Sequence, residues 1–204
     1  MDIKELMSDC VNLRSLSTQI KYLTDSADIG VEDCLFIMID IQEKFRGIIH
    51  ELETVVKNSD ILNKASEILK IPLIVTEHVP EKLGKTLTEL YVPENVFRFE
   101  KTRFSVFDEK ISEFVESMSK PVLVIYGIEA HICILQSCLD AIKRGYHVLL
   151  VADAISSRKE YNKDVGIKML SQKGVEIVTT EMLLFRLIKD AKYESFKDIA
   201  KLIK

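Results

Sequence analysis

The sequence predicts an α/β fold, a three-layer sandwich in which helices flank a mostly parallel sheet of about six strands. Short apolar runs recur along the chain, segments with helical spacing separate them, and no repeat or low-complexity tract interrupts the alternation. Strands that alternate with helices form βαβ units, and such units build parallel sheets. Ligands of these folds bind at the carboxyl ends of the strands, so functional residues are expected directly after the apolar runs.

Each expected strand is a short run of apolar residues. Residues 34–39 are continuously apolar and too few for a typical helix, which is the pattern of a strand buried on both faces. The remaining expected strands span residues 72–75, 96–99, 122–126, 148–151 and 175–178.

Between these runs, apolar residues recur at the spacing of helices. The expected helices span residues 52–69, 111–118, 132–142, 161–170, 182–188 and 196–203. Gly145 and Gly174 follow two of them and are typical C-terminal caps. Residues 1–30 show looser helical spacing, and we expect them to form an N-terminal helical extension of a domain that spans residues 31–204.

The composition is that of a globular protein rather than a disordered or fibrous one. The chain has 204 residues, 47% of them hydrophobic, and a net charge of −4. This mild acidity indicates neither a nucleic-acid partner nor an anionic membrane, and no apolar run approaches the roughly 18 to 20 residues of a spanning helix. The first ten residues do not have the pattern of a signal peptide. The four cysteines form no C-x-x-C pair, so we expect reduced thiols and a cytoplasmic location.

Three reactive side chains follow three different expected strands. Asp40 follows the first strand, Lys101 the strand at 96–99, and Cys133 lies in the opening turn of the helix after strand 122–126. A thiol is a poor nucleophile at its free pKa of about 8.5, and a nearby ammonium or a helix N-terminus stabilises the thiolate. A carboxylate can accept the thiol proton and return it to a leaving amine. The three positions therefore suit nucleophilic catalysis by a cysteine.

Each of these residues also has an ordinary structural interpretation. Asp40 could cap the following helix, Lys101 could be a solvated surface lysine, and Cys133 could pack in the core. Core packing is the interpretation that we give to the other three cysteines, Cys10, Cys34 and Cys138. Spacing alone leaves both interpretations of the three reactive residues open.

Four stretches, taken in order, carry a resemblance to a known family. They are residues 39–45 (IDIQEKF), 100–105 (EKTRFS), 127–133 (GIEAHIC) and 145–158. Over roughly residues 33–190 the chain resembles the isochorismatase-like cysteine hydrolase superfamily, and more narrowly the isochorismatase domain-containing proteins. The resemblance implies the isochorismatase-like variant of the α/β sandwich.

The resemblance also implies a catalytic triad of Asp40, Lys101 and Cys133. The family places a cis, non-proline peptide bond before its cysteine-bearing helix, which corresponds to Ile128–Glu129 here. The backbone N–H groups of Glu129 and Cys133 would then form the oxyanion hole. The implied reaction is hydrolysis of a small amide through a covalent acyl-enzyme on Cys133.

The sequence leaves the substrate undetermined. Six residues near the strand ends are expected to bind it: Phe45, Glu77, His78, Phe104, Ala130 and His131. Ala130 stands where many superfamily hydrolases carry threonine, and Cys133 stands where the nominal isochorismatases lack a cysteine, so their vinyl-ether hydrolysis is not implied.

We expect no metal and no cofactor. The superfamily's nicotinamidases hold a metal through an aspartate and paired histidines after the second strand, whereas His78 here has no second histidine nearby. The expected partner is a small-molecule substrate, without nucleic acid or membrane. By resemblance the chain is expected to form a homo-oligomer.

Three alternatives can be compared with this hypothesis. A nucleotide or flavin module needs glycines in its first β-to-α turn, and here the first glycine is Gly47. An aspartate phosphotransferase usually needs a second carboxylate two positions on, where this chain has Gln42. A catalytically silent family member that acts as an oligomeric scaffold or small-molecule binding protein stays open.

Overall fold

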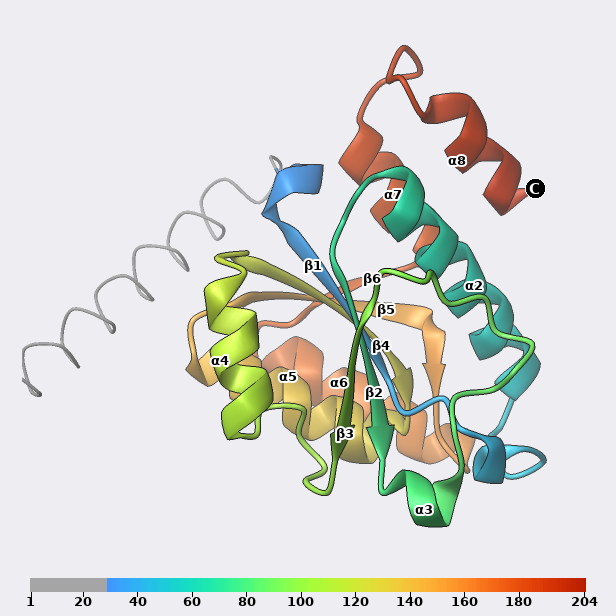
Figure 1. The fold of residues 1–204 in the computed structure, drawn as a ribbon, viewed down its shortest axis with the longest axis vertical. Helices are drawn as coiled ribbons and strands as arrows, with labels where there is room; N and C mark the ends of the chain where they lie inside the picture. The colour runs from blue at the N-terminus through green and yellow to red at the C-terminus, as the bar shows by residue number, and fades with distance from the viewer. Residues whose placement is uncertain (1–28) are drawn as a thin grey trace, which may run out of the picture.

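The computed structural model describes residues 29–204, so the expected extension at residues 1–30 lies outside the described residues except for its last two positions. A single six-stranded sheet, all parallel, has the order β3-β2-β1-β4-β5-β6 (Figure 1), which confirms the predicted fold class. The strands are β1 (Cys34–Ile39), β2 (Leu73–His78), β3 (Phe97–Lys101), β4 (Val122–Ile128), β5 (His147–Ser156) and β6 (Glu176–Val178).

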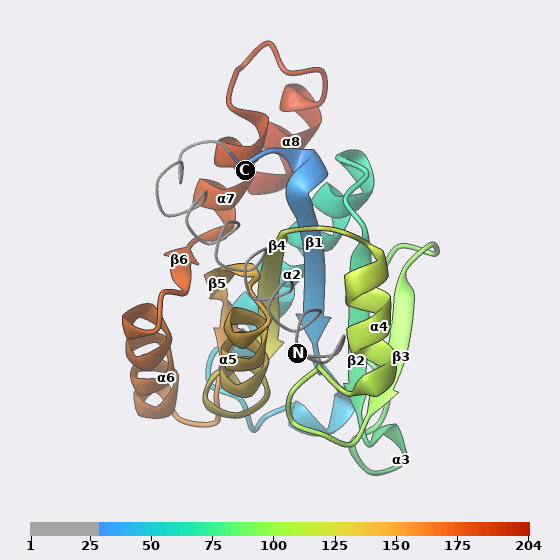
Figure 2. The same cartoon turned by 90° about the vertical axis from the view of Figure 1, so that its left-hand side faces the viewer.

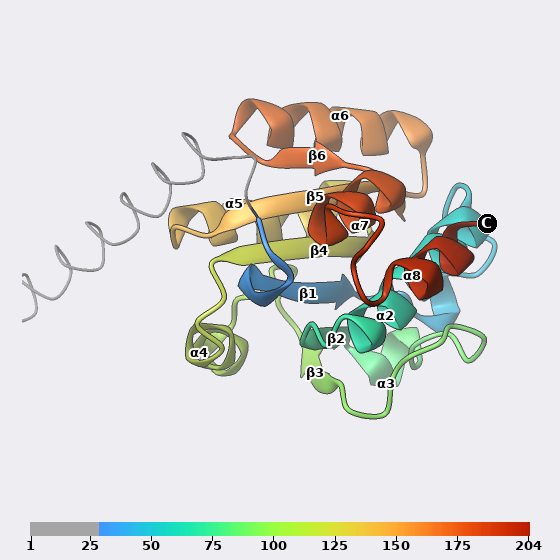
Figure 3. The same ribbon diagram turned by 90° about the horizontal axis from the view of Figure 1, so that it is seen from above.

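Helices cover both faces of the sheet. They are α2 (Leu52–Ile68), α3 (Pro80–Leu83), α4 (Glu109–Ser117), α5 (Leu135–Lys143), α6 (Glu160–Gln172), α7 (Thr180–Ile188) and α8 (Phe196–Ile203). Figure 2 shows α4, α5 and α6 in front of one face, and the view from above in Figure 3 shows α2, α7 and α8 on the other. None of these helices is long and apolar enough to cross a membrane.

The two central strands form the middle of the core. All six residues of β1 and all seven of β4 are buried, as expected for apolar runs that are covered on both faces. The order of the strands reverses between β1 and β4. From β1 the chain goes on to β2 and β3 toward one edge of the sheet, and from β4 it goes on to β5 and β6 toward the other. Such a switch point leaves a crevice at the carboxyl ends of the strands, where open α/β sheets bind ligands.

Strand β2 is longer than the sequence predicts. It continues to His78 because Glu77 and His78 pair with Glu100 and Lys101 of β3. On its other side, beyond the end of β1, the side-chain amide of Gln42 takes the place of a neighbouring strand. Gln42 Nε2 donates to the His78 carbonyl at 3.1 Å, and Gln42 Oε1 accepts from the His78 N–H at 2.8 Å. Thr76, Glu77 and His78 are therefore strand residues whose side chains alternate between two faces, rather than loop residues.

Further segments differ from the predicted boundaries. Strand β3, expected at 96–99, runs on to Lys101, which is therefore the last strand residue, and β5, expected at 148–151, runs on to Ser156. The single turn of α3 is not predicted, since four residues are too few to show helical spacing. The helix expected at 132–142 begins instead as a short π-helix, η3 (Ala130–Ile134), and continues as α5. Cys133 thus lies in the opening turn, as predicted, and its side chain is placed by π rather than α geometry.

Candidate active site

Asp40 and Lys101 form a buried ion pair at the carboxyl edge of the sheet. Lys101 Nζ lies 2.6 Å from Asp40 Oδ2, and the two side chains are 0% and 1% exposed. They are 61 positions apart in the chain, and the parallel strands β1 and β3 bring them together. The interpretation of Lys101 as a solvated surface lysine is therefore wrong.

The backbone and a neighbouring hydroxyl fix the orientation of Asp40. Its φ of +53° lies in the left-handed region, which aspartate tolerates better than most residues. The Thr76 hydroxyl donates to Asp40 Oδ1 at 2.7 Å, while Lys101 occupies Oδ2. Both carboxylate oxygens thus have a hydrogen-bond donor, and Asp40 does not serve as a simple helix cap.

The Lys101 ammonium has three acceptors within hydrogen-bond distance. Besides Asp40, it donates to the backbone carbonyls of Arg103 and Phe104, each at 3.1 Å. These bonds hold the loop after β3 against the ion pair, and Phe104 belongs to this loop. Lys101 therefore orders both the carboxylate and part of the cavity wall.

Cys133 lies beside this pair with its thiol protonated. Burial and the charge of Asp40 raise the pKa of the thiol to about 12, and the charge of Lys101 lowers it too little to offset them. A hydrogen bond from the thiol to Asp40 also raises the pKa, and a hydrogen bond that the Lys101 ammonium donates to the sulfur lowers it. The ammonium alone therefore does not produce a resting thiolate, so the thiol needs a proton acceptor, and Asp40 is the adjacent one.

The turn between β4 and η3 requires close backbone packing. Gly127 has a φ of +117°, and a Cβ atom there would lie 2.1 Å from the Ile39 carbonyl oxygen. The following peptide bond, Ile128–Glu129, is cis, as the family resemblance implied. Ser137 adds a further constraint, since its hydroxyl donates to the Cys133 carbonyl at 2.6 Å and accepts from the Val106 N–H at 3.0 Å.

A cavity of about 460 Å³ opens onto Cys133. Four residues predicted to be functional line it together with Cys133: Phe45, His78, Phe104 and Glu129. The His78 and Phe104 rings pack at 5.5 Å between centroids, and burial followed by the charge of Lys101 lowers the pKa of His78. A neutral imidazole and two aromatic rings thus surround the entrance to the thiol.

Three residues predicted to bind substrate do not line this cavity. Glu77 points to the opposite face of β2, where it accepts hydrogen bonds from the Thr86 N–H and hydroxyl at 2.7 and 2.8 Å. Ala130 is buried where Gly166 of α6 approaches its carbonyl, and His131 pairs with the Ser157 hydroxyl at 2.9 Å. Strand alternation and helix geometry direct all three away from Cys133.

Sequence reasoning missed six residues that do line the cavity. They are Lys44, Ile48, Lys82, Leu83, Ile132 and Arg158. Lys44, Ile132 and Arg158 lie within three of the four motif stretches, and their place in those stretches was a usable signal. Lys82 and Leu83 come from α3, for which the sequence gives no signal.

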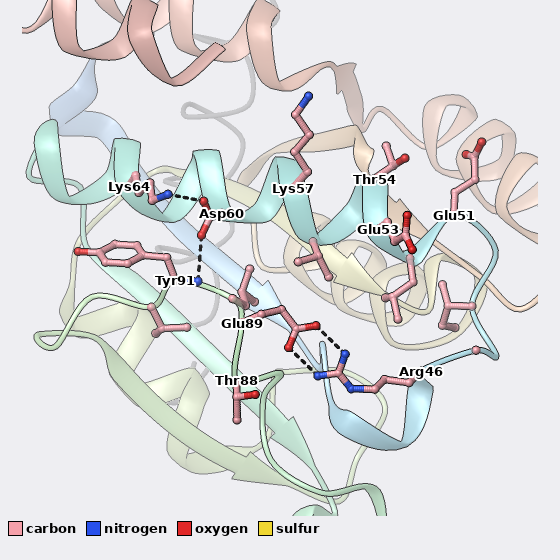
Figure 4. Close-up of a pocket in the computed structure, with 16 residues that line it drawn as sticks. Arg46, Glu51, Glu53, Thr54, Lys57, Asp60, Lys64, Thr88, Glu89 and Tyr91 are labelled. Atoms are coloured by element: carbon pink, nitrogen blue, oxygen red, sulfur yellow. Dashed lines mark hydrogen bonds and ion pairs between the residues drawn. The ribbon is translucent and has the colours of Figure 1, made fainter. Parts of the chain in front are cut away.

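A cavity larger than the one at Cys133 lies elsewhere. It has a volume of about 1210 Å³ and runs between α2 and the loop at residues 88–92 (Figure 4). Two ion pairs bridge its lining, Arg46 with Glu89 at 2.5 Å and Lys64 with Asp60 at 2.5 Å. No cysteine lines it, so the smaller cavity at Cys133 is the candidate active site.

The sequence of this chain matches the Isochorismatase domain over residues 34–182. Isochorismatase domain-containing protein 2 of Danio rerio is 40% identical over 176 residues, which cover 86% of this chain and 89% of that protein. The chain belongs to the isochorismatase family. Its resemblance to isochorismatase-like hydrolases, inferred from four sequence stretches, is thereby confirmed.

Several solved structures share the fold. The structure of MAR1 ribonuclease from Caenorhabditis elegans has a TM-score of 0.82 and 33% identity, and the match covers 86% of this chain and 91% of that one. The YcaC gene product of Escherichia coli, described as an octameric hydrolase of unknown specificity, has a TM-score of 0.78 at 19% identity. That match covers 86% of this chain and 88% of YcaC. Within residues 29–204 of this isochorismatase family chain, no three His, Cys, Asp or Glu side chains cluster so that they could hold a metal ion.

Proposed function

We propose that this isochorismatase family chain is a cysteine hydrolase that cleaves a small amide. The observation that carries the proposal is the contact of a cavity-lining thiol with a buried carboxylate–ammonium pair. Burial makes this pair costly unless it is well hydrogen-bonded, and its bonds to Thr76 and two carbonyls meet that condition. A buried, fully bonded pair beside a nucleophile is characteristic of a catalytic site.

In the acylation step, Asp40 accepts the Cys133 proton as the sulfur attacks the amide carbonyl carbon. The C=O π electrons move onto oxygen, and the tetrahedral intermediate then expels the amine, which takes the proton from Asp40. Lys101 keeps its charge throughout and balances Asp40 and the developing thiolate. The product of this step is a thioester on Cys133.

In the deacylation step, Asp40 accepts a proton from water while the water oxygen attacks the thioester carbon. Collapse of the second intermediate releases the carboxylic acid, and the Asp40 proton returns to sulfur. The sum is amide and water converted to acid and amine. The N–H groups of Glu129 and Cys133 are proposed to stabilise both oxyanions, and one such donor is typically worth about a hundredfold in rate.

The nematode neighbour is described as a ribonuclease, but we favour acyl transfer for this chain. The reactive group of the cavity is a thiol, whose sulfur is a strong nucleophile toward carbonyl carbon. A net charge of −4 also gives the chain no general attraction to nucleic acid. By analogy with the octameric YcaC, we further propose that the chain forms a homo-oligomer.

A screen of small amides with ammonia release as the readout tests this function. Wild-type protein is expected to release ammonia from at least one amide, and Cys133→Ala is expected to release none while keeping its fold, since alanine is well tolerated in helices. Turnover that survives in Cys133→Ala would refute the mechanism.

Iodoacetamide labelling separates the hydrolase from a silent scaffold. Cys133 opens onto the cavity, whereas Cys34 and Cys138 are fully buried, so Cys133 is expected to react fastest among the described cysteines. The advantage should disappear in Lys101→Ala, which removes the cation beside the sulfur. Equal and slow labelling of all cysteines would favour the scaffold.

A further inference from the structure

We infer that the Cys133 cavity selects an anionic substrate, a small acyl compound whose carboxylate lies at the outer end of the cavity. This inference rests on the proposed function and names the substrate class of the same site. It is carried by three cationic side chains at the cavity, Lys44, Lys82 and Arg158, which neither the triad nor the oxyanion hole uses.

The charges of the cavity wall do not cancel. Lys44, Lys82 and Arg158 face a single lining carboxylate, that of Glu129. Deeper in the site, Lys101 and Asp40 neutralise each other at 2.6 Å. A positive cavity in a chain with a net charge of −4 is a local feature that composition does not explain.

The one lining carboxylate serves to orient one of the cations. Glu129 is buried and accepts hydrogen bonds from the Arg158 N–H at 2.9 Å and from Arg158 Nε at 3.1 Å. Among residues 29–204 the guanidinium is bonded only through Nε, so its two terminal nitrogens can donate to a ligand. A guanidinium held in this way suits a planar carboxylate, to which it can donate two parallel bonds.

The two lysines supply charge without a competing partner. Lys44 and Lys82 are exposed and make no ion pair within the described part of the chain. They come from two elements, the turn after β1 and α3, which Gln42 joins through its bonds to the His78 and Gly84 carbonyls. A cleft lined by charges of one sign raises the local concentration of oppositely charged small molecules.

The remaining walls are apolar and set the size of the ligand. The same cavity is also lined by five apolar side chains, Phe45, Ile48, Leu83, Phe104 and Ile132. The volume of about 460 Å³ is at the small end of the range for ligand pockets, roughly 300 to 1,000 Å³. The cavity therefore fits a compact apolar body with a carbonyl beside Cys133 and a carboxylate at the rim.

Two alkylating reagents of nearly equal size test the inference without knowledge of the substrate. Iodoacetate is anionic and iodoacetamide is neutral, and in both the Cys133 sulfur displaces iodide from a CH₂ group. Both reagents react with the same thiolate, so the fraction of Cys133 that is ionised enters both rates equally and drops out of their ratio. The ratio therefore reports the charge of the cavity. Mass spectrometry of the Cys133 peptide gives both rates, and glutathione gives the ratio for a free thiol.

The wild-type ratio of iodoacetate to iodoacetamide is expected to exceed that of glutathione. Lys44→Gln and Lys82→Gln should each lower it about threefold, and the double variant about tenfold, at low ionic strength. About 0.5 M NaCl should lower the wild-type ratio in the same direction. Lys82→Arg should preserve it, and Lys197→Gln, which removes one positive charge from the distant helix α8, should leave it unchanged.

The failures of the two proposals are distinguishable. A wild-type ratio no higher than that of glutathione, or a ratio that the double variant does not change, overturns the anionic substrate and leaves the hydrolase in place. Failure of Cys133 to react with either reagent removes the nucleophile and overturns both proposals.

Discussion

At the scale of single residues, Asp40 has two opposing effects on Cys133. Burial is the largest cause that raises the pKa of the thiol to about 12, and the negative charge of Asp40 is the second. This charge therefore disfavours the thiolate. The same carboxylate is the adjacent group that can take the proton when a substrate carbonyl arrives. An arrangement of this kind keeps the thiol neutral at rest and reactive in the complex.

Replacing Asp40 by asparagine should therefore separate alkylation from turnover. Asparagine tolerates the left-handed backbone at this position, and loss of the negative charge lowers the pKa of the Cys133 thiol. Iodoacetamide labelling of Cys133 should then become about tenfold faster at neutral pH, whereas amide turnover should fall at least about a hundredfold. Rate measurements on the same preparation check both.

The pH dependence of labelling gives the matching check on the wild type. A thiol with a pKa of about 12 is almost wholly protonated at neutral pH, so its alkylation rate should rise about tenfold per pH unit from about pH 7 to about pH 10 without a plateau. Lys101→Met should slow labelling, because removing a cation raises the pKa further. A plateau near neutral pH, or slower labelling in Asp40→Asn, would contradict this account.

At the scale of elements, the contact between β1 and β4 holds Asp40 and Cys133 in place. Gly127 pairs with Ile39, the residue before Asp40, and Cys133 follows Gly127 by six positions. Gly127→Ala should cost at least about 2 kcal/mol in the free energy of unfolding, because the new Cβ would lie 2.1 Å from the Ile39 carbonyl oxygen. Urea unfolding, together with Cys133 labelling, measures both consequences.

Gly47→Ala is the matched control for this prediction. Gly47 also has a positive φ, +68°, but no atom lies within 4 Å of its potential Cβ. Its replacement should cost only about 1 kcal/mol, the price of the backbone conformation alone. Equal losses in the two variants would show that the approach of β1 to β4 has no special role.

The elements also show where sequence reasoning fails. The continuously apolar runs predict β1 and β4 well, because burial on both faces leaves a signal in every residue. The sequence does not reveal that β2 extends to His78, because the extension depends on pairing with β3 and on Gln42, which lies 36 positions from His78. Without the extension, Glu77 and His78 look equivalent, although strand alternation directs only His78 into the cavity.

At the scale of the whole molecule, the fold and the reactive residues could be predicted and most of the cavity wall could not. Alternation of strands and helices predicts a parallel sheet, and its carboxyl edge predicts where Asp40, Lys101 and Cys133 lie. The wall depends on side-chain directions in loops and in the single turn of α3, which no local pattern records. Lys82 is an example, since only the folded position of α3 brings it to the cavity.

Acid should destabilise the molecule partly through Glu77, the residue that turns away from the site. Burial raises the pKa of Glu77, but hydrogen bonds from Thr86 and the charge of Lys85, 3.4 Å away, outweigh burial and leave the pKa below its usual 4.5. Because the pKa is lower in the folded state, the charged carboxylate stabilises the fold at pH values above the pKa of the unfolded state. This stability is lost as the pH falls through the pKa of the folded state. Glu77→Gln should therefore lose about 1 kcal/mol of unfolding free energy at about pH 7 and nothing at about pH 3. Urea unfolding across this pH range measures the difference, and Glu81→Gln, at an exposed position, is the control. If the unfolding free energies of wild type and Glu77→Gln change with pH in parallel, Thr86 does not stabilise the charged form of Glu77.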